Sequence, residues 1–315
     1  MIVDGIFECS DDGKVLLECL DIGIVSATIP SSVESIKKYA FAHCTCLRSV
    51  NIPDSVTSIG GRAFYDCTSL ESVYIPDSVK SLGTGAFDMC LSLKSANIPD
   101  SVTSIEDLTF SGCRSLESAN IPVSVESIGK SAFAHCSSLR SVNVPNSVTS
   151  IGNQAFSDCE SLESVYLPES VKSIGESAFS GCTSLKSVEV GKLNENYVSE
   201  NNVVYSKDRS VLVLYPAGRT DQSFDIPDTV TSVGEWAFSH CESLKSVNIP
   251  DSVRSIGDGA FAYCKYLESV NIPDCVTSIE GFAFAGCTRL TSVTIPRSIE
   301  LRFMTFDGNT EIKRF

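Results

Sequence analysis

The sequence predicts an α/β repeat solenoid of stacked 23-residue units, with a parallel β-sheet along one face and short helices opposite. A proline ladder with a step of 23 residues is the first observation behind this prediction. An alternating apolar pattern precedes each proline, and a Gly-x-x-Ala-Phe-x-x-Cys phrase follows it. The prolines are Pro30, Pro53, Pro76, Pro99, Pro122, Pro145 and Pro168, then Pro227, Pro250, Pro273 and Pro296.

One unit reads L-x-S-V-x-I-P-x-S-V-x-S-I-G-x-x-A-F-x-x-C-x-S. The L-x-S-V-x-I segment predicts a strand, which ends at the proline because proline has no N–H for a ladder. S-V-x-S-I predicts a second extended piece with Val and Ile inward, and G-x-x-A-F-x-x-C predicts one or two helical turns. Stacked units should align one spine: Phe41, Phe64, Phe87, Phe110, Phe133, Phe156, Phe179, Phe238, Phe261 and Phe284.

Ten of the fourteen cysteines fill one slot of the repeat, which indicates a packing position. Because free cysteine is a small and often buried hydrophobe, we expect a reduced, buried cysteine ladder rather than disulfides. Cys9, Cys19, Cys46 and Cys275 lie outside the slot and are interpreted as single substitutions. The chain contains no Cys-x-x-Cys pair with a matching His pair, so we do not expect a zinc site. The ladder is Cys44, Cys67, Cys90, Cys113, Cys136, Cys159, Cys182, Cys241, Cys264 and Cys287.

The phrase L-x-x-V-x-I-P-x-S-V-x-S-I-G-x-x-A-F-x-x-C resembles the leucine-rich repeats of the BspA-like family, also called the Treponema pallidum type. The resemblance covers about residues 24–315 and recurs ten times. It implies a leucine-rich-repeat solenoid with a binding or adhesion role, often at the surfaces of bacteria and parasitic protists. It implies no catalytic residues.

The repeat array is interrupted once, which divides the chain into four parts. They are an N-terminal β-hairpin cap at 1–29, seven repeats at 30–190, a β-hairpin insert at 191–226, and three repeats with a partial one at 227–315. Residues 5–30 align without gaps on 202–227, so the same hairpin module opens the chain and splits the array. This alignment matches Phe7 with Val204, Asp11 with Asp208 and Leu16 with Val213.

The insert is either a structural repeat or a binding loop, because insertions in repeat arrays often gather on the functional face. Its candidate ligand-binding residues are Tyr197, Tyr205, Tyr215 and Arg219.

Polar residues of the predicted strands form rows about 4.8 Å apart from coil to coil. The slot after Leu alternates in charge, the next slot is serine from Ser49 to Ser292, and the third carries Tyr74, Tyr166 and Glu189. These rows are either a solvated, self-satisfied sheet or a docking surface. Tyrosine is enriched at interface hot spots, so Tyr74 and Tyr166, roughly 19 Å apart, could grip one extended ligand.

An acidic row follows the prolines and indicates turns, because an Asp side chain can bond the backbone two residues on. A calcium row is the alternative, but calcium needs six to eight oxygens around one point, and Val123 and Asn146 interrupt the line. The expected metal and cofactor content is therefore none. The row is Asp54, Asp77, Asp100, Val123, Asn146, Glu169, Asp228, Asp251 and Asp274.

No combination of residues in the sequence predicts a catalytic site. His43, His135 and His240 occupy a variable slot, far apart along the array and without a third orienting group. Trp236 occupies another variable slot, which predicts a half-exposed helix face.

The net charge of −15 disfavours nucleic acid and anionic lipid as partners. No secretory signal is visible in MIVDGIFECSDDGK, and no apolar stretch predicts membrane insertion. The thiols favour the cytoplasm, whereas the family resemblance implies a cell surface. We expect a non-enzymatic scaffold that binds a protein or surface ligand on its sheet face, or alternatively a structural subunit of a larger complex. The sequence leaves the oligomeric state open.

Overall fold

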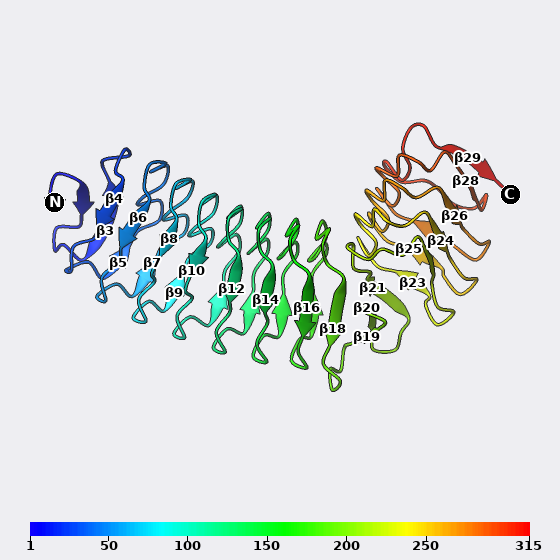
Figure 1. The fold of residues 1–315 in the computed structure, drawn as a ribbon, viewed down its shortest axis with the longest axis horizontal. Coiled ribbons are helices and arrows are strands. Elements are labelled where there is room, and N and C mark those ends of the chain that lie inside the picture. Colours follow the sequence, from blue (N-terminus) through cyan, green and yellow to red (C-terminus); the bar gives the residue numbers. More distant parts are fainter. The chain divides into compact units, whose positions relative to one another are not determined.

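The computed structural model describes all 315 residues and consists of stacked coils of β-strands and turns (Figure 1). The chain forms two compact units. Unit 1 contains Met1–Leu162 and Ser173–Phe179, and unit 2 contains Glu163–Lys172 and Ser180–Phe315. None of its segments forms a helix long and apolar enough to cross a membrane.

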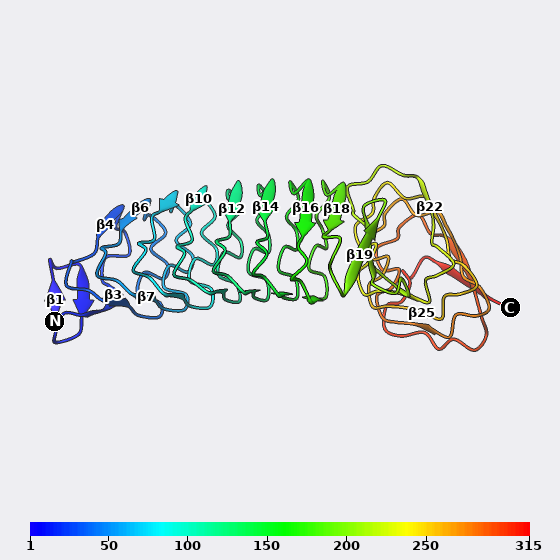
Figure 2. The same cartoon turned by 90° about the horizontal axis from the view of Figure 1, so that it is seen from below.

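Each full coil contributes two short strands, which we name after their residues. The SV strands begin at the serine of L-x-S-V, and the SI strands cover the Ser-Ile of S-V-x-S-I. Figure 2 shows the SV strands of unit 1 along one side of the stack, away from the SI side. The SV strands of unit 1 are β4 (Ser26–Thr28), β6 (Ser49–Asn51), β8 (Ser72–Val73), β10 (Ser95–Ala96), β12 (Ser118–Asn120) and β14 (Ser141–Asn143). Its SI strands are β5 (Ser35–Ile36), β7 (Ser58–Ile59), β9 (Ser81–Leu82), β11 (Ser104–Ile105), β13 (Ser127–Ile128), β15 (Ser150–Ile151) and β17 (Ser173–Ile174).

Unit 2 repeats this arrangement. Its SV strands are β16 (Ser164–Leu167), β18 (Ser187–Val190), β22 (Ser223–Asp225), β24 (Ser246–Asn248), β26 (Ser269–Asn271) and β28 (Ser292–Ile295), followed by β29 (Glu311–Arg314). Its SI strands are β23 (Ser232–Val233), β25 (Ser255–Ile256) and β27 (Ser278–Ile279). The hairpin strands are β1 (Ile2–Val3), β2 (Phe7–Cys9) and β3 (Val15–Cys19) in unit 1, and β19 (Tyr197–Glu200), β20 (Val203–Ser206) and β21 (Val211–Leu214) in unit 2.

Neighbouring repeat strands pair in parallel, and each residue faces its equivalent in the next coil, as Ser49 faces Ser72. This register aligns the predicted phenylalanine spine. Consecutive rings from Phe41 to Phe179 stack with centroids 4.9 to 5.6 Å apart in unit 1. In unit 2 the stack runs from Phe238 to Phe306. The predicted stacking is therefore confirmed within each unit, as is the parallel sheet face, but in unit 2 the ring stacked before Phe238 is Tyr215 and not a phenylalanine of the spine.

The predicted short helices are wrong, because no residue of the chain is helical. The G-x-x-A-F-x-x-C segment forms two successive turns instead. In the first coil, the Ala40 N–H donates to Lys37 O, and the Cys44 N–H donates to Phe41 O. The third residue of each turn, Tyr39 or His43, has a positive φ, as a type II turn requires.

The reason lies in the backbone bonds between coils. The Phe41 N–H donates to Ala63 O of the next coil at 2.7 Å, and the Tyr39 and His43 N–H groups also donate to that coil. An α-helix would need these same donors for its own carbonyls four residues earlier. Trp236 accordingly lies on such a turn, with φ 57° and a half-buried side chain, and not on a helix face.

The cysteine ladder is buried and unbridged, and all fourteen cysteines are free. Within it, the Cys67 thiol donates to Phe41 O at 3.1 Å, and the Cys90 thiol donates to Phe64 O at 3.2 Å. Each of these thiols therefore satisfies a spine carbonyl of the preceding coil. Cys46 is exposed and Cys275 is half-exposed, whereas Cys9 and Cys19 are buried in the cap.

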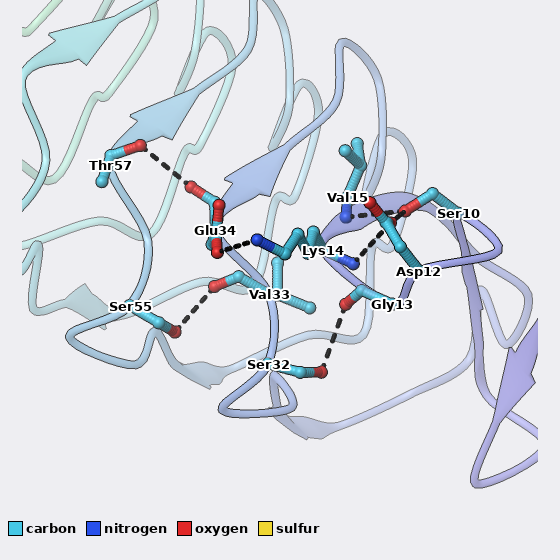
Figure 3. Close-up of polar contacts among 10 residues, drawn as sticks. All are labelled: Ser10, Asp12, Gly13, Lys14, Val15, Ser32, Val33, Glu34, Ser55 and Thr57. Atoms are coloured by element: carbon cyan, nitrogen blue, oxygen red, sulfur yellow. Dashed lines mark hydrogen bonds and ion pairs between the residues drawn. The ribbon is translucent and has the colours of Figure 1, made fainter.

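The cap and the insert contain the same kind of hairpin, as expected. The structure, however, aligns the two hairpins one residue away from the gapless alignment of residues 5–30 on 202–227. At the cap tip, Ser10 Oγ donates to Asp12 Oδ1 at 2.6 Å and accepts from the Val15 N–H (Figure 3). Ser206 and Asp208 make the same contact in the insert. Asp208 therefore corresponds to Asp12, and the gapless match with Asp11 is wrong.

This one-residue shift changes which side chains are buried. Both hairpins contain a register shift, after which Cys9 pairs with Leu16 in the cap and Tyr205 pairs with Leu212 in the insert. Because strand side chains alternate between faces, a slip of one residue exchanges the two faces. Tyr205 thus takes the place of the buried Cys9, and its ring is buried as well.

Candidate functional site

The SV strands of unit 1 present the predicted polar rows to solvent. Glu71 lies between Arg48 and Lys94 on the neighbouring coils, with N–O distances of 3.9 and 3.4 Å. The side-chain amide of Asn97 donates to Ile75 O and accepts from the Ile75 N–H. It therefore makes the two hydrogen bonds that a neighbouring strand backbone would otherwise make with Ile75. Part of the hydrogen-bonding and charge-pairing capacity of these rows is therefore used within the protein. Tyr74, in contrast, projects from the row with 63% of its surface exposed.

The first SV strands of unit 2 carry Tyr166 and Glu189 side by side, because they pair in register between β16 and β18. Tyr166 is 46% exposed, and its hydroxyl lies 3.5 Å from Glu169 Oε1, to which it donates. Lost hydration and the Glu169 carboxylate raise the pKa of the Tyr166 phenol. Tyr74 belongs to unit 1, so the expectation that both tyrosines hold one ligand remains a prediction.

An open groove of about 1000 Å³ lies on the SV strands of unit 2. Its floor consists of the serine row and the row two residues further on, and Asp251, Asp274 and Cys275 line one side. Lys313 and Phe315, from the last strand segment, also line it. The lining residues are Ser223, Phe224, Asp225, Ser246, Val247, Asn248, Asp251, Glu268, Ser269, Val270, Asn271, Ile272, Pro273, Asp274, Cys275, Ser292, Val293, Thr294, Lys313 and Phe315.

The turns after Pro250 and Pro273 leave the carboxylates of Asp251 and Asp274 unused, which differs from the sequence expectation. In the turn after Pro250, the Val253 N–H donates to the proline carbonyl, and Ser252 Oγ donates to Val230 O. The Asp251 side chain is thus not needed for the turn. The expected Asp-to-backbone bond is therefore wrong. The polar rows of the sequence alone did not reveal the groove. The features that could have indicated it are Asp225, which occupies a slot that is asparagine in many repeats, and the final strand.

Asn194 lies near the start of the insert, and no sequence pattern other than the break in the repeat indicates its role. Its side chain is fully buried and donates from Nδ2 to Pro168 O and Val171 O, both at 2.9 Å. Its Oδ1 accepts from the backbone N–H groups of Asn196 and Tyr197. Asn194 therefore links the start of the insert to the coil before it.

The predicted insert residue Arg219 is held in a polar cluster. Its Nε donates to Asp221 Oδ2 at 2.7 Å, and Nη1 donates to the carbonyl of Asn201. The Tyr215 hydroxyl donates to the same Asp221 oxygen at 2.8 Å, and the guanidinium lies over the Tyr215 ring. The Arg219 and Tyr215 hydrogen bonds lower the pKa of the Asp221 carboxyl. Arg219 is thus oriented before any ligand arrives.

A second cavity, of about 610 Å³, lies at this cluster. It brings Lys186 near Arg219, and it shares Phe224 with the SV groove. Its lining residues are Lys186, Asn201, Asn202, Gly218, Arg219, Thr220, Asp221 and Phe224.

None of the three candidate tyrosines of the insert lines this cavity, although Tyr215 belongs to the cluster beside it. Tyr205 and Tyr215 are buried, and burial raises the pKa of Tyr205 to about 12. Tyr197 is half-buried on β19. Of the four candidates in the insert, Arg219 is the one that lines the cavity of about 610 Å³.

The histidines lie on the turns, away from both cavities. His43 Nδ1 is 3.0 Å from Asp66 Oδ2, and His135 Nδ1 is 3.3 Å from Asp158 Oδ2. No group of three or more His, Cys, Asp or Glu side chains is placed to hold a metal ion.

Comparisons with known proteins agree with this fold. The family model described as the BspA type leucine rich repeat region matches residues 19–125, 103–207 and 219–315, with 6 copies. A leucine rich cell surface protein from Faecalibacterium prausnitzii A2-165 has a similar structure, with 33% identity and a TM-score of 0.81. That comparison covers 99% of this chain and 94% of the relative.

A leucine-rich repeat protein from Bacteroides ovatus ATCC 8483 is 27% identical, with a TM-score of 0.53. The comparison covers 96% of this chain and 87% of the relative. A search of curated proteins returns no match.

Proposed function

Because this chain belongs to the BspA-type leucine-rich-repeat family, we propose that it is a non-enzymatic scaffold that binds a protein or surface ligand through its SV strands. The single observation that carries the proposal is the groove on the SV strands of unit 2, where polar and carboxylate side chains surround about 1000 Å³ of open space. A self-satisfied sheet would present paired groups there.

The tyrosines of the SV strands support the same surface. Tyr74 and Tyr166 are exposed although tyrosine is a large side chain, and tyrosine often anchors protein interfaces. Glu189 stands beside Tyr166 and adds a charge to the same patch. In the insert, Arg219 contributes a positioned cation at the second cavity, and Tyr197 lies on the hairpin nearby.

A location at a cell surface is part of this proposal. The relative from Faecalibacterium prausnitzii is described as a cell surface protein, and it matches nearly the whole length of this chain. Adhesion would then be one use of the SV surface.

Site-specific photo-cross-linking tests the proposal. A photo-reactive phenylalanine analogue at Tyr166 should cross-link a partner from native cells or their surroundings. The same analogue at Tyr263 is the matched control, because Tyr263 is 45% exposed in the same unit but lies on a turn. Equal cross-linking at both positions, or cross-linking at Tyr263 alone, would contradict a role for the SV strands.

The partner identified by cross-linking also tests the alternative of a fixed structural subunit, when its binding is measured again without the cross-link. A partner that stays bound through high-salt washing without cross-linking indicates a permanent assembly. A partner that leaves under these conditions indicates a reversible ligand, as we expect for a polar surface.

A further inference from the structure

We propose that the groove on the SV strands of unit 2 binds an extended, lysine- or arginine-rich peptide segment. This inference rests on the proposed function and names the chemistry of the ligand at one part of the SV surface. The argument uses the charge of the groove, its dimensions and the side chains at its floor.

The groove is acidic, and three of its four acidic side chains form no ion pair, although the Arg254 guanidinium donates to the backbone carbonyl of Asp251 at 2.6 Å. Asp225, Asp251 and Asp274 line it, and their carboxylates form no ion pair or hydrogen bond with the chain. The other two charged lining residues are already paired: Glu268 with Arg289 at 3.4 Å, and Lys313 with Glu311 at 3.3 Å. Three free carboxylates along one groove therefore select a ligand with several positive charges.

The dimensions fit an extended segment. The lining residues come from four successive SV strands, β22, β24, β26 and β28, from β29, which pairs with β28, and from residues that flank these strands. At a strand spacing of about 4.8 Å this span is on the order of 19 Å. An extended chain covers about 3.3 Å per residue, so the groove accommodates roughly six residues.

The floor suits a peptide with long basic side chains. Serine and asparagine side chains of β24 and β26 offer donors and acceptors to a peptide backbone. Phe224 and Val270 are partly buried apolar residues of the groove, and Phe315 is exposed. Lysine and arginine carry apolar stems that pack against such surfaces while their charged ends reach the carboxylates.

The same charges disfavour the other occupants of a groove this size. Nucleic acid and anionic lipid would bring phosphates against three carboxylates. A second copy of this chain carries a net charge of −15, so self-association would bring like charges together.

Binding of dye-labelled hexalysine, followed by fluorescence anisotropy at low and physiological salt, is the first test. The variant Asp225→Asn/Asp251→Asn/Asp274→Asn should bind about tenfold more weakly, since three exposed ion pairs with the ligand, each weak by itself, are lost together. Hexaglutamate should not bind. Each variant is first shown to melt at the wild-type temperature, which is expected because the three side chains are exposed.

The matched control is Asp54→Asn/Asp77→Asn/Asp100→Asn in unit 1. These three residues follow repeat prolines, as Asp251 and Asp274 do, and they are exposed. Their replacement removes the same charge as the groove variant. Hexalysine affinity should change less than about twofold in this variant. An equal loss in both variants, or no loss in the groove variant, would overturn the inference, because binding would then reflect overall charge or another surface.

A thiol-protection experiment locates the ligand independently. Cys275 lines the groove and is half-exposed, whereas Cys46 is exposed in unit 1. Hexalysine should slow maleimide labelling of Cys275 and leave the rate at Cys46 unchanged. Unprotected Cys275 would contradict the location. Cross-linking of a non-basic partner at Tyr166 alongside absent hexalysine binding would reject this inference alone and leave the proposed scaffold function standing.

Discussion

The rings of Phe133 and Phe156 lie parallel, with centroids 5.3 Å apart and an interplanar angle of 1°. Phe156 also stacks on Phe179 on its other side, at 5.4 Å. Both Phe133 and Phe156 are completely buried. Each coil contributes one ring, so the ring stack and the backbone ladder advance together by one coil at a time.

Truncation of this spine should be costly. Phe156→Ala removes a buried ring and leaves a cavity between two rings, so we expect it to lower the free energy of unfolding by about 3–5 kcal/mol. Urea unfolding monitored by circular dichroism measures the loss. Tyr74→Ala is the control, because its exposed side chain should change stability by less than about 0.5 kcal/mol. Similar losses in the two variants would show that the stack does not stabilise the solenoid.

The glycine of the Ser-Ile-Gly phrase is required by the close approach of neighbouring coils. A Cβ atom on Gly152 would lie 2.6 Å from the carbonyl carbon of Gly129 and 2.7 Å from the Lys130 nitrogen. Gly152→Ala should therefore destabilise unit 1 by about 1–3 kcal/mol through overpacking. Gly308→Ala is the control, since nothing lies within 4 Å of its added Cβ. Thermal melting of both proteins makes the comparison, and an unchanged Gly152→Ala midpoint would argue against tight coil contact.

Asn194 should be the most sensitive residue of the insert. Asn194→Ala removes the side-chain donor of the buried Val171 carbonyl and the acceptor of the Asn196 and Tyr197 N–H groups, whereas Pro168 O keeps the Val171 N–H. A buried polar group left unsatisfied costs about 1–3 kcal/mol. We expect a loss of roughly 2–4 kcal/mol and faster hydrogen exchange in β19. Asn196→Ala provides the control, because its side chain is exposed. Exchange in β19 that is equally slow in both variants would refute the role of Asn194.

Thiol accessibility should divide the cysteines sharply. Cys46 is exposed and Cys275 half-exposed, whereas the other twelve thiols are buried. We therefore expect two thiols to react with a maleimide under native conditions and all fourteen to react in denaturant. Mass spectrometry of the labelled peptides identifies them. Rapid labelling of a ladder thiol such as Cys136 in the folded chain would contradict the buried ladder.

Alkaline pH should weaken the fold through the same ladder. Burial raises the pKa of Cys67 and of Cys136 to about 12, from an ordinary value of 9.0. Because the folded pKa is the higher one, this stabilisation is fully present below about pH 9 and is lost as the pH rises toward 12. Each thiol should account for about 2 kcal/mol between pH 9 and 10.5. Urea midpoints at the two pH values measure the loss, which should be smaller in Cys67→Ala/Cys136→Ala; an equal loss would assign the effect to other groups.

The outcome at the insert shows where sequence reasoning reaches its limit. Aligning the two hairpins by residue type matched Asp11 with Asp208, and only the pairing of β20 with β21 revealed the one-residue shift. Burial alternates along a strand, so the gapless match sets Tyr205 against the exposed Glu8, whereas the structure sets it against the buried Cys9. A Ser-x-Asp motif occurs at both hairpin tips, and its serine and aspartate are in contact in the structure. Aligning the two motifs would have given the correct match of Asp12 with Asp208.

The sequence by itself determined the solenoid, its 23-residue step, the phenylalanine spine, the cysteine ladder and the exposed rows of the SV strands. It could do so because each slot is repeated about ten times, and a recurring apolar slot can be satisfied only by stacking. Tertiary structure alone decided that the Ala-Phe segment forms turns and not helices, because its N–H groups bond to the next coil. It also decided the groove, since Asp225, Asp251 and Phe315 meet there only after five strands have been placed side by side.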